Sequence, residues 1–372
     1  MAFKLLALTI LFVALGAQSS PTPDASCTIN SVNDVNTVVS SCTTITVGSF
    51  TVPAGTTMIM NLKQGSKVSF TGTIDWAHKE WNGYLLEIIG NSVTVEGTGN
   101  HLFHGHGEQY WDGLGGAGTK KPTFMYLKGT DSTFKNFKIK NCPMRCVAID
   151  GSNNLVASGF TIDNAEGAPG TAKSGKEGHN TDGFDIDKST YVTVKDATVT
   201  NQDDCVAING AQHITIDNFH CIGSHGFDIA TGMSSDYDQN VVQNVTFSNS
   251  VLDGGMYGIH ILTCNDGGQG KVDTVYYKNI KINGPSDYGV MFQQDFSNAK
   301  QGSTGNPTGN VPISNVYVNG VSGTMNGQYS SAVTIRCAAC SNISFDSSFS
   351  ITGAKAKDEC KNFQPTGYTC KT

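Results

Sequence analysis

Short stretches in which apolar and polar residues alternate recur along most of this chain, and most of them end in Asn, Asp or Gly. β-Branched and aromatic residues fill the apolar positions, which is typical of strands with one buried face. One set includes Val93-Thr-Val-Glu-Gly, Phe137-Lys-Ile-Lys-Asn, Ile214-Thr-Ile-Asp-Asn, Val245-Thr-Phe-Ser-Asn and Val316-Tyr-Val-Asn-Gly. A second set, interleaved with it, includes Cys146-Val-Ala-Ile, Gly183-Phe-Asp-Ile, Cys205-Val-Ala-Ile, Gly226-Phe-Asp-Ile and Gly258-Ile-His-Ile.

Strand and turn repeat with a period of about 20 to 40 residues, which indicates a repeat architecture. One coil cannot bury its apolar face alone, so stacked coils form the core. We therefore predict an all-β fold, a right-handed parallel β-helix, as one domain over residues 18–372. One short helix is expected near residues 31–41. A β-sandwich is the alternative, but it would not place chemically active residues at one fixed position of the repeat.

Three successive repeats carry an acid or a histidine directly before a small residue and an apolar strand. They are Asn180-Thr-Asp-Gly-Phe-Asp-Ile, Gln202-Asp-Asp-Cys-Val-Ala-Ile and Gly223-Ser-His-Gly-Phe-Asp-Ile, and their strands begin 22 and 21 residues apart. If each offset is one coil, neighbouring strands stack about 4.8 Å apart. Asp182, Asp204 and His225 then form a column, with Asp203 beside it.

Strand alternation adds two outward rows beside this column, because the apolar residues between them point into the core, and the column and the two rows together predict one surface groove. The predicted inward residues are Phe184, Ile186, Val206, Ile208, Phe227, Ile229, Ile259 and Ile261. The predicted rows are Asp182, Asp204, His225, Tyr257 and Tyr288; then Asp185, Ala207, Asp228 and His260; and then Asp187, Asn209, Ala230 and Leu262.

Clustered carboxyl groups suit glycosidic cleavage, because one protonated acid releases the leaving oxygen while an ionised one activates water. Like charges within about 5 Å raise the pKa of one carboxyl group, which separates the two roles. Asp203 and Asp204 are adjacent, so both reach the groove only if the chain bends just before Cys205. Each motif alone would suit a solvated turn, and a calcium site is a further alternative. Repetition in three coils favours a catalytic site.

Charge and composition narrow the function further. The net charge is −7 and the pI is near 5.7, which argues against a nucleic-acid partner because that needs a basic face. Met1 to about Ala17 is predicted to be a secretory signal, and no later stretch suits a membrane span. Eleven cysteines fit an oxidising, extracellular compartment. Asn244 and Asn342 begin candidate glycosylation sequons.

These motifs resemble the polygalacturonase family of secreted glycoside hydrolases over nearly the whole mature chain. The matches are Asn180-Thr-Asp, Gln202-Asp-Asp and Ser224-His-Gly, with weaker support from Trp111-Asp-Gly and Gln293-Gln-Asp. The resemblance implies inverting hydrolysis of α-1,4-linked galacturonan in pectin and no cofactor. It makes Asp203 the general acid and His225 the support of its protonation state. Asp182 and Asp204 would hold and activate the water, and the substrate-binding candidates are Asn180, Gln202 and His260.

The chain departs from the family where two cations grip the substrate's carboxylates. Polygalacturonases carry Arg-Ile-Lys there, whereas this chain has His260-Ile-Leu262; Phe296 also replaces a family Tyr, and Asp228 adds an anion. A charge-assisted contact contributes about 1.5–3 kcal/mol, so two losses would weaken binding strongly. His260 is expected to gain charge only in acid, so affinity should fall as the pH rises near about 6.5. Candidate compensating cations are Arg145, Lys173 and Lys176.

Cysteine and histidine pairs raise smaller questions. Spacing and the resemblance together suggest the disulfides Cys27–Cys42, Cys142–Cys146, Cys205–Cys221, Cys337–Cys340 and Cys360–Cys370, with Cys264 unpaired. Cys205 is therefore not expected to be a nucleophile, and a disulfide is favoured over zinc for the 337–340 pair. His104-x-His106 is interpreted as a polar turn at the groove mouth rather than a metal pair.

Three functions remain open. The first is an endo-acting polygalacturonase, a monomer whose partner is pectin. The second is a non-catalytic pectin-binding protein, and the third is a hydrolase of a less charged or decorated galacturonan. The replaced cations are the main support for the second and third.

Overall fold

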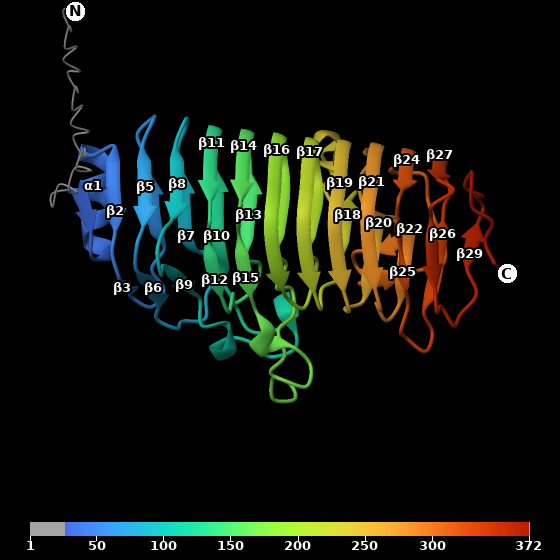
Figure 1. Ribbon diagram of the computed structural model, residues 1–372, viewed down its shortest axis with the longest axis horizontal. Helices are drawn as coiled ribbons and strands as arrows, with labels where there is room; N and C mark the ends of the chain where they lie inside the picture. The colour runs from blue at the N-terminus through green and yellow to red at the C-terminus, as the bar shows by residue number, and fades with distance from the viewer. Residues whose placement is uncertain (1–26, 372) are drawn as a thin grey trace, which may run out of the picture.

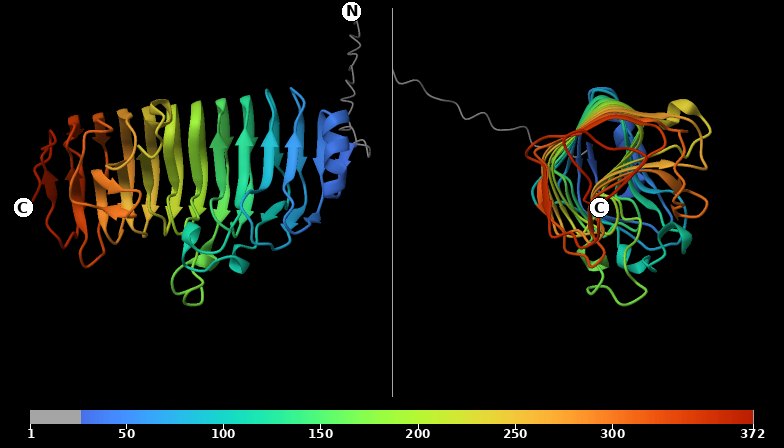
Figure 2. Two further views of the ribbon diagram at one scale, coloured as in Figure 1. Left: turned by 180° about the vertical axis from the view of Figure 1, so that it is seen from behind. Right: turned by 90° about the vertical axis from the view of Figure 1, so that its right-hand side faces the viewer.

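A computed structural model describes residues 27–371. The predicted secretory signal lies outside the described residues. Parallel strands stack along one long axis, and each turn of the chain adds one strand to each of three series (Figure 1). Viewed along the axis, successive coils superpose on one another (Figure 2). The predicted parallel β-helix is confirmed.

The first series forms the face on which the site was expected. Its strands are β4 (Met58–Asn61), β7 (Tyr84–Ile89), β10 (Thr123–Lys128), β13 (Val147–Asp150), the starts of β16 (Phe184–Thr200) and β17 (Val206–Ile222), β18 (Phe227–Thr231), β20 (Tyr257–Cys264), β22 (Tyr288–Ser297), β26 (Ser331–Arg336) and β29 (Glu359–Lys361). A short strand, β23 (Gly302–Ser303), pairs antiparallel with β22.

The other two series complete each coil. The second contains β1 (Thr28–Ile29), β2 (Thr44–Val47), β5 (Lys67–Phe70), β8 (Thr94–Gly97), β11 (Thr130–Lys135), β14 (Asn153–Ser158), the middles of β16 and β17, the starts of β19 (Val241–Asp253) and β21 (Lys271–Asn283), β24 (Ile313–Asn319) and β27 (Cys340–Phe345). The third contains β3 (Phe50–Val52), β6 (Thr73–Trp76), β9 (Leu102–His104), β12 (Lys138–Lys140), β15 (Thr161–Asp163), the ends of β16, β17, β19 and β21, β25 (Ser322–Thr324) and β28 (Ser350–Thr352).

Helical segments are short. The expected helix is α1 (Val35–Ser41), preceded by the 3₁₀ turn η2 (Val32–Asp34), and it lies at the N-terminal end of the solenoid (Figure 1). Its buried residues Val35, Val38 and Val39 join the core, so α1 covers the apolar end of the first coil. The other 3₁₀ turns are η3 (Gly107–Gln109), η4 (Gly115–Ala117), η5 (Ala165–Gly167) and η6 (Tyr237–Asn240).

A ladder of aromatic rings runs through the core along the axis. Consecutive ring centroids in it lie 4.8 to 6.4 Å apart, within the range of favourable ring contacts. Its members are Phe70, Phe103, Phe137, Phe160, Phe184, Phe219, Phe227, Phe247, Tyr277 and Phe292. All the predicted inward residues of the site coils are fully buried, so the predicted alternation is confirmed there.

Asparagines turn the chain after strand segments of the second series. Asn218, Asn249 and Asn279 have φ values of 56°, 51° and 54°. Asparagine tolerates this left-handed conformation better than most residues. The Asn218 amide donates to Asp196 in the preceding coil, and the Asn279 amide donates to Asn249. The Asn that ends many of the repeats therefore has a structural role.

All five suggested disulfides are present, and Cys264 is free and buried. The disulfides occupy the sulfurs of Cys205 and Cys337, which rules out the thiol nucleophile and the zinc interpretation. Asn244 and Asn342 are exposed, and their glycosylation stays a prediction. Within residues 27–371, no helix has the length and hydropathy of a membrane span.

Candidate active site

An open groove of about 700 Å³ crosses the first series of strands. Acidic, neutral and apolar side chains line it, together with two arginines. The lining includes Asp182, Asp185, Asp203, Asp204, His225 and Asp228, and also Ala230, Tyr257, His260, Leu262, Met291, Gln293 and Phe296. The structure therefore brings the four predicted catalytic residues together in one groove.

Strand pairing produces the predicted rows with one exception. Asp185, Ala207, Asp228 and His260 are register partners in successive strands, as expected. Ala230 and Leu262 are also partners. Asp187, however, pairs with Gly210 and not with Asn209, because an irregularity shifts the register after Ile186. This part of the third predicted row is wrong, although Asn209 still faces the groove.

The turn between β16 and β17 brings adjacent aspartates to the same groove, as the predicted bend requires. Asn201, which is buried, donates from its side-chain amide to three backbone oxygens, those of Thr181, Asp203 and Asp204, at 3.0, 3.0 and 2.8 Å. These bonds hold the turn to the neighbouring coil. Sequence reasoning missed Asn201; its position directly before Gln202-Asp-Asp was the only signal.

Asp203 is held as a carboxylate by several donors. Its Oδ2 accepts from the backbone and side-chain nitrogens of Asn180, both at 3.2 Å. Its Oδ1 lies 3.2 Å from Nδ1 of His225 and accepts from the backbone of Asp204 at 3.0 Å. Burial acts to raise the pKa of Asp203, but the hydrogen bond and charge of His225, with His179, outweigh it, so the pKa is lowered. A carboxyl group that acts as a general acid on its own would instead need a raised pKa.

The other two aspartates have the opposite environment. Burial raises the pKa of Asp182 well above its usual range, and the charges of Asp185 and Asp203 add to this. Burial also raises the pKa of Asp204, followed by the charges of Asp228 and Asp203. In such a coupled group, ionisation of one carboxyl keeps the next one protonated. The groove can therefore hold both protonated and ionised acids, as acid–base catalysis requires.

His260 does not supply the missing cation. It is buried, its Nδ1 lies 3.3 Å from Oδ1 of Asp228, and its Nε2 is 2.9 Å from the amide nitrogen of Gln293. Burial lowers the pKa of His260 to about 3, and the charge of His225 adds to this effect. The ring is neutral near pH 6.5, so the expectation that it titrates there is wrong.

Two arginines remain at the groove. Arg145 is half-exposed, and its Nε is 3.4 Å from Oδ1 of Asp185 and 3.9 Å from Oδ2 of Asp182. Arg336 was missed by sequence reasoning, although it continues the row of Leu262 through Gln293. It pairs with Glu359 at 2.8 Å, so part of its charge is already neutralised. The other suggested cations, Lys173 and Lys176, are exposed but do not line the groove.

The two amide residues predicted to bind substrate have different positions. Asn180 lines the groove, and its side-chain oxygen accepts from the backbone of Gly116 at 3.0 Å. Gln202 does not line the groove. Its side chain bonds instead to Thr181 and to the backbone oxygen of Asn164, so it positions the turn. His104 and His106 also do not line the groove, contrary to their expected place at its mouth.

Comparisons with known proteins agree with this geometry. The model of glycosyl hydrolases family 28 matches residues 42–370. A polygalacturonase from Phaedon cochleariae is 40% identical over the full length of both chains, and endopolygalacturonase I from Aspergillus niger is 37% identical over 93% of this chain and 91% of its own. The structure of endopolygalacturonase I from Stereum purpureum, complexed with two galacturonate, has a TM-score of 0.78 and 32% identity, covering 90% of this chain and 97% of that one. The resemblance is confirmed, and the chain belongs to family 28 of the glycosyl hydrolases.

Proposed function

We propose that the chain is an extracellular, endo-acting polygalacturonase that cleaves α-1,4-galacturonosyl linkages of pectin with inversion at the anomeric carbon. The observation that carries this proposal is the meeting of Asp182, Asp203 and Asp204 in one groove that is open and crosses several coils. An open groove that crosses several coils suits internal bonds of a long polymer. The names of the relatives support the same substrate class.

Asp203 and His225 together serve as the general acid in this proposal. One proton is shared between Oδ1 of Asp203 and Nδ1 of His225, which are 3.2 Å apart. Transfer of that proton from Asp203 to the glycosidic oxygen breaks the bond to the anomeric carbon. The lowered pKa of Asp203 in the free protein reflects the hydrogen bond and then the charge of His225, which outweigh the effect of burial. When His225 is neutral, that stabilisation is lost and the proton resides more readily on Asp203.

Asp182 and Asp204 share the second task. One of them, ionised, accepts a proton from a water molecule, whose oxygen attacks the anomeric carbon from the face opposite the leaving group. The other, protonated because its pKa is raised by burial, orients that water. The products are a new reducing end of inverted configuration and a free hydroxyl group on the leaving chain.

The test is hydrolysis of demethylated polygalacturonan, followed by reducing ends, product sizes and NMR of the first anomer formed. Asp203→Asn should lower kcat by about 10²–10⁴-fold, the usual contribution of a general acid. Oligomers of mixed length should appear early, and the β-anomer should form first. Binding without turnover by the unchanged chain would instead identify a pectin-binding protein.

A second candidate function is hydrolysis of methyl-esterified or decorated galacturonan. The neutral His260 and the apolar Leu262 favour it, because neither offers charge to a carboxylate. Asp228, in the row of His260, would repel a substrate carboxylate if it were ionised. Parallel assays with demethylated polygalacturonan, methylated pectin and xylogalacturonan separate the two. Release from only the esterified or decorated polymers would establish this second function and exclude the first.

A further inference from the structure

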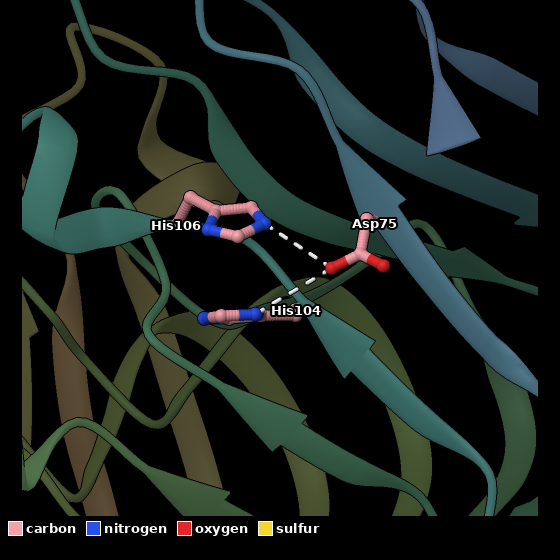
Figure 3. A group of neighbouring side chains, drawn as sticks. All are labelled: Asp75, His104 and His106. Carbon is pink, nitrogen blue, oxygen red and sulfur yellow. Dashed lines mark hydrogen bonds and ion pairs between the residues drawn. The ribbon is translucent and has the colours of Figure 1, made fainter. Parts of the chain in front are cut away.

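Three side chains with metal-binding atoms meet at the base of the loop that joins β9 to β10, outside the groove. Asp75 of β6 and His104 of β9 are register partners, and His106 follows two residues after His104. Figure 3 shows the two imidazole rings one above the other, each directed toward Asp75. Nδ1 of His104 is 3.5 Å and Nε2 of His106 is 3.1 Å from the same oxygen, Oδ1 of Asp75.

We propose that Asp75, His104 and His106 bind a divalent transition-metal ion, with Zn²⁺ the best fit. Bonds of about 2.0–2.1 Å place the ligand atoms of a tetrahedral zinc site about 3.3 Å apart. The separations of 3.5 and 3.1 Å lie on either side of that value. Two imidazoles with one carboxylate suit zinc, copper or nickel better than calcium or magnesium. A water molecule would complete the tetrahedron.

The outer edge of the His106 ring supports the same assignment. Nδ1 of His106 is 3.1 Å from Oε1 of Glu108, whereas Nε2 of His104, 4.0 Å from Oε2 of the same carboxylate, makes no hydrogen bond. Asn141 donates to that Oε2 at 2.7 Å and fixes its orientation. A histidine that binds a metal usually donates its other N–H to such a carboxylate.

A proton count gives an independent reason to expect a cation here. A neutral imidazole has only one N–H, yet His106 lies between the carboxylates of Asp75 and Glu108. In a neutral ring, one of those contacts would place a nitrogen lone pair against an anion, whereas a second proton or a bound metal ion would supply the positive charge that the two carboxylates require. A metal ion on Nε2 removes this conflict and leaves the Nδ1 hydrogen for Glu108.

The position of the cluster suggests what the metal does. The loop that starts beside His106 continues to Gly116, whose backbone nitrogen donates to the side chain of Asn180 at 3.0 Å. Asn180 in turn donates to Asp203. A bound metal would link two strands to the first residues of this loop. It therefore stabilises the support of the groove without touching substrate.

Metal binding can be measured directly on the secreted chain after chelator treatment and dialysis. Titration calorimetry with ZnCl₂ should give one site, and Co²⁺ should give the visible absorption of a tetrahedral complex. Zn²⁺ should also raise the Tm. His104→Gln and His106→Gln should each weaken Zn²⁺ binding by more than about 100-fold, and Glu108→Gln by about 10–100-fold, the range of an outer carboxylate.

Two control variants locate the site. His220→Gln alters an exposed His–Asp pair in the same third series, with Nε2 of His220 2.6 Å from Asp253, and should leave binding unchanged. His225→Gln alters the other cluster of close ligand atoms, that of Asp203, Asp204 and His225, and should also leave it unchanged. The proposal is overturned if the unchanged chain binds no Zn²⁺, if His106→Gln binds it normally, or if His225→Gln abolishes binding. Should His104→Gln or His106→Gln fail to fold, the ZnCl₂ titration of Glu108→Gln, a change at an exposed position, tests the proposal instead.

Discussion

At the scale of single residues, two outward positions of β20, His260 and Leu262, decide what charge a substrate meets in the groove. His260 is neutral because it is buried between Asp228 and Gln293, and Leu262 beside it is apolar. The substitutions were visible in the sequence. The neutrality of His260 was not, because the burial that causes it comes from other coils.

Leu262→Lys should shift the substrate preference of the groove toward demethylated polygalacturonan. The new ammonium group would lie in the groove, where a charge-assisted contact contributes about 1.5–3 kcal/mol, so KM for demethylated polygalacturonan should fall by about 10–100-fold. Leu262→Met keeps a neutral chain of similar size and is the matched control. KM values for demethylated and methylated polymers test this. An equal fall for both would contradict a charge effect.

Cys264 should be unreactive in the native protein. It is free and only 1% exposed, and burial, with the charge of Asp266, raises the pKa of its thiol to about 11. Because the thiolate is the reactive form, a thiol reagent at pH 8 should label the native chain far more slowly than the unfolded chain. Unfolding without reductant should release one thiol per chain. Rapid native labelling would contradict this burial.

At the scale of elements, the turn from Asn201 to Cys205 determines whether adjacent aspartates can act together. The sequence showed that the chain had to bend there, since Asp203 and Asp204 would otherwise face opposite sides. It did not show what holds the bend. The Asn201 amide reaches oxygens on two coils, and that contact depends on stacking rather than on any local pattern.

Asn201→Ala should therefore lower activity by displacing both aspartates. It leaves three backbone oxygens without their shared donor, so we expect a loss of about 1–3 kcal/mol in the free energy of unfolding. The fall in kcat should exceed the fall in folded protein. Asn218→Ala is the control, because this exposed turn asparagine makes one bond to Asp196, far from the groove. Denaturant unfolding and kcat measured on both variants separate stability from positioning.

At the scale of the whole molecule, the repeat explains what could be predicted. The recurring strand motif and strand alternation placed Asp185, Ala207, Asp228 and His260 in one row, although the coils differ in length. The register shift beside Asp187 has no local signal, so Asn209 was misplaced. Arg336 could have been found by continuing the row of Leu262 through two more coils. Asp75 and His104 lie in a strand series without a site motif, and only the strand register joins them.

The groove also makes the stability of the whole chain depend on pH. Burial raises the pKa of Asp228, as it does for Asp182 and Asp204, and raises that of Asp185 to about 6. A carboxyl group whose pKa is raised in the folded chain costs no stability at a pH below its pKa in the unfolded chain, near 3.8. The free energy of unfolding then falls as the pH rises through the pKa of the folded chain. Tm should therefore fall from pH 4 toward pH 7.5.

Asp228→Asn tests this directly, because the amide cannot ionise. Its Tm should exceed that of the unchanged chain at pH 7.5 and match it near pH 4, with about 1.4 kcal/mol for each unit of pKa shift removed. Asp217→Asn, at a partly exposed position outside the groove, is the control and should leave the pH profile unaltered. An equal rise in Tm at both pH values would mean that Asp228→Asn acts through packing and not through charge.

The N-terminal helix covers one end of the solenoid, while the acids sit on coils near its middle. Heat or proteases that loosen a terminal coil break contacts with one neighbour only. Several intact turns then still separate the damage from Asp182 and Asp204. Partly frayed molecules should keep their chemistry, so loss of function on heating should lag behind the first loss of strand structure.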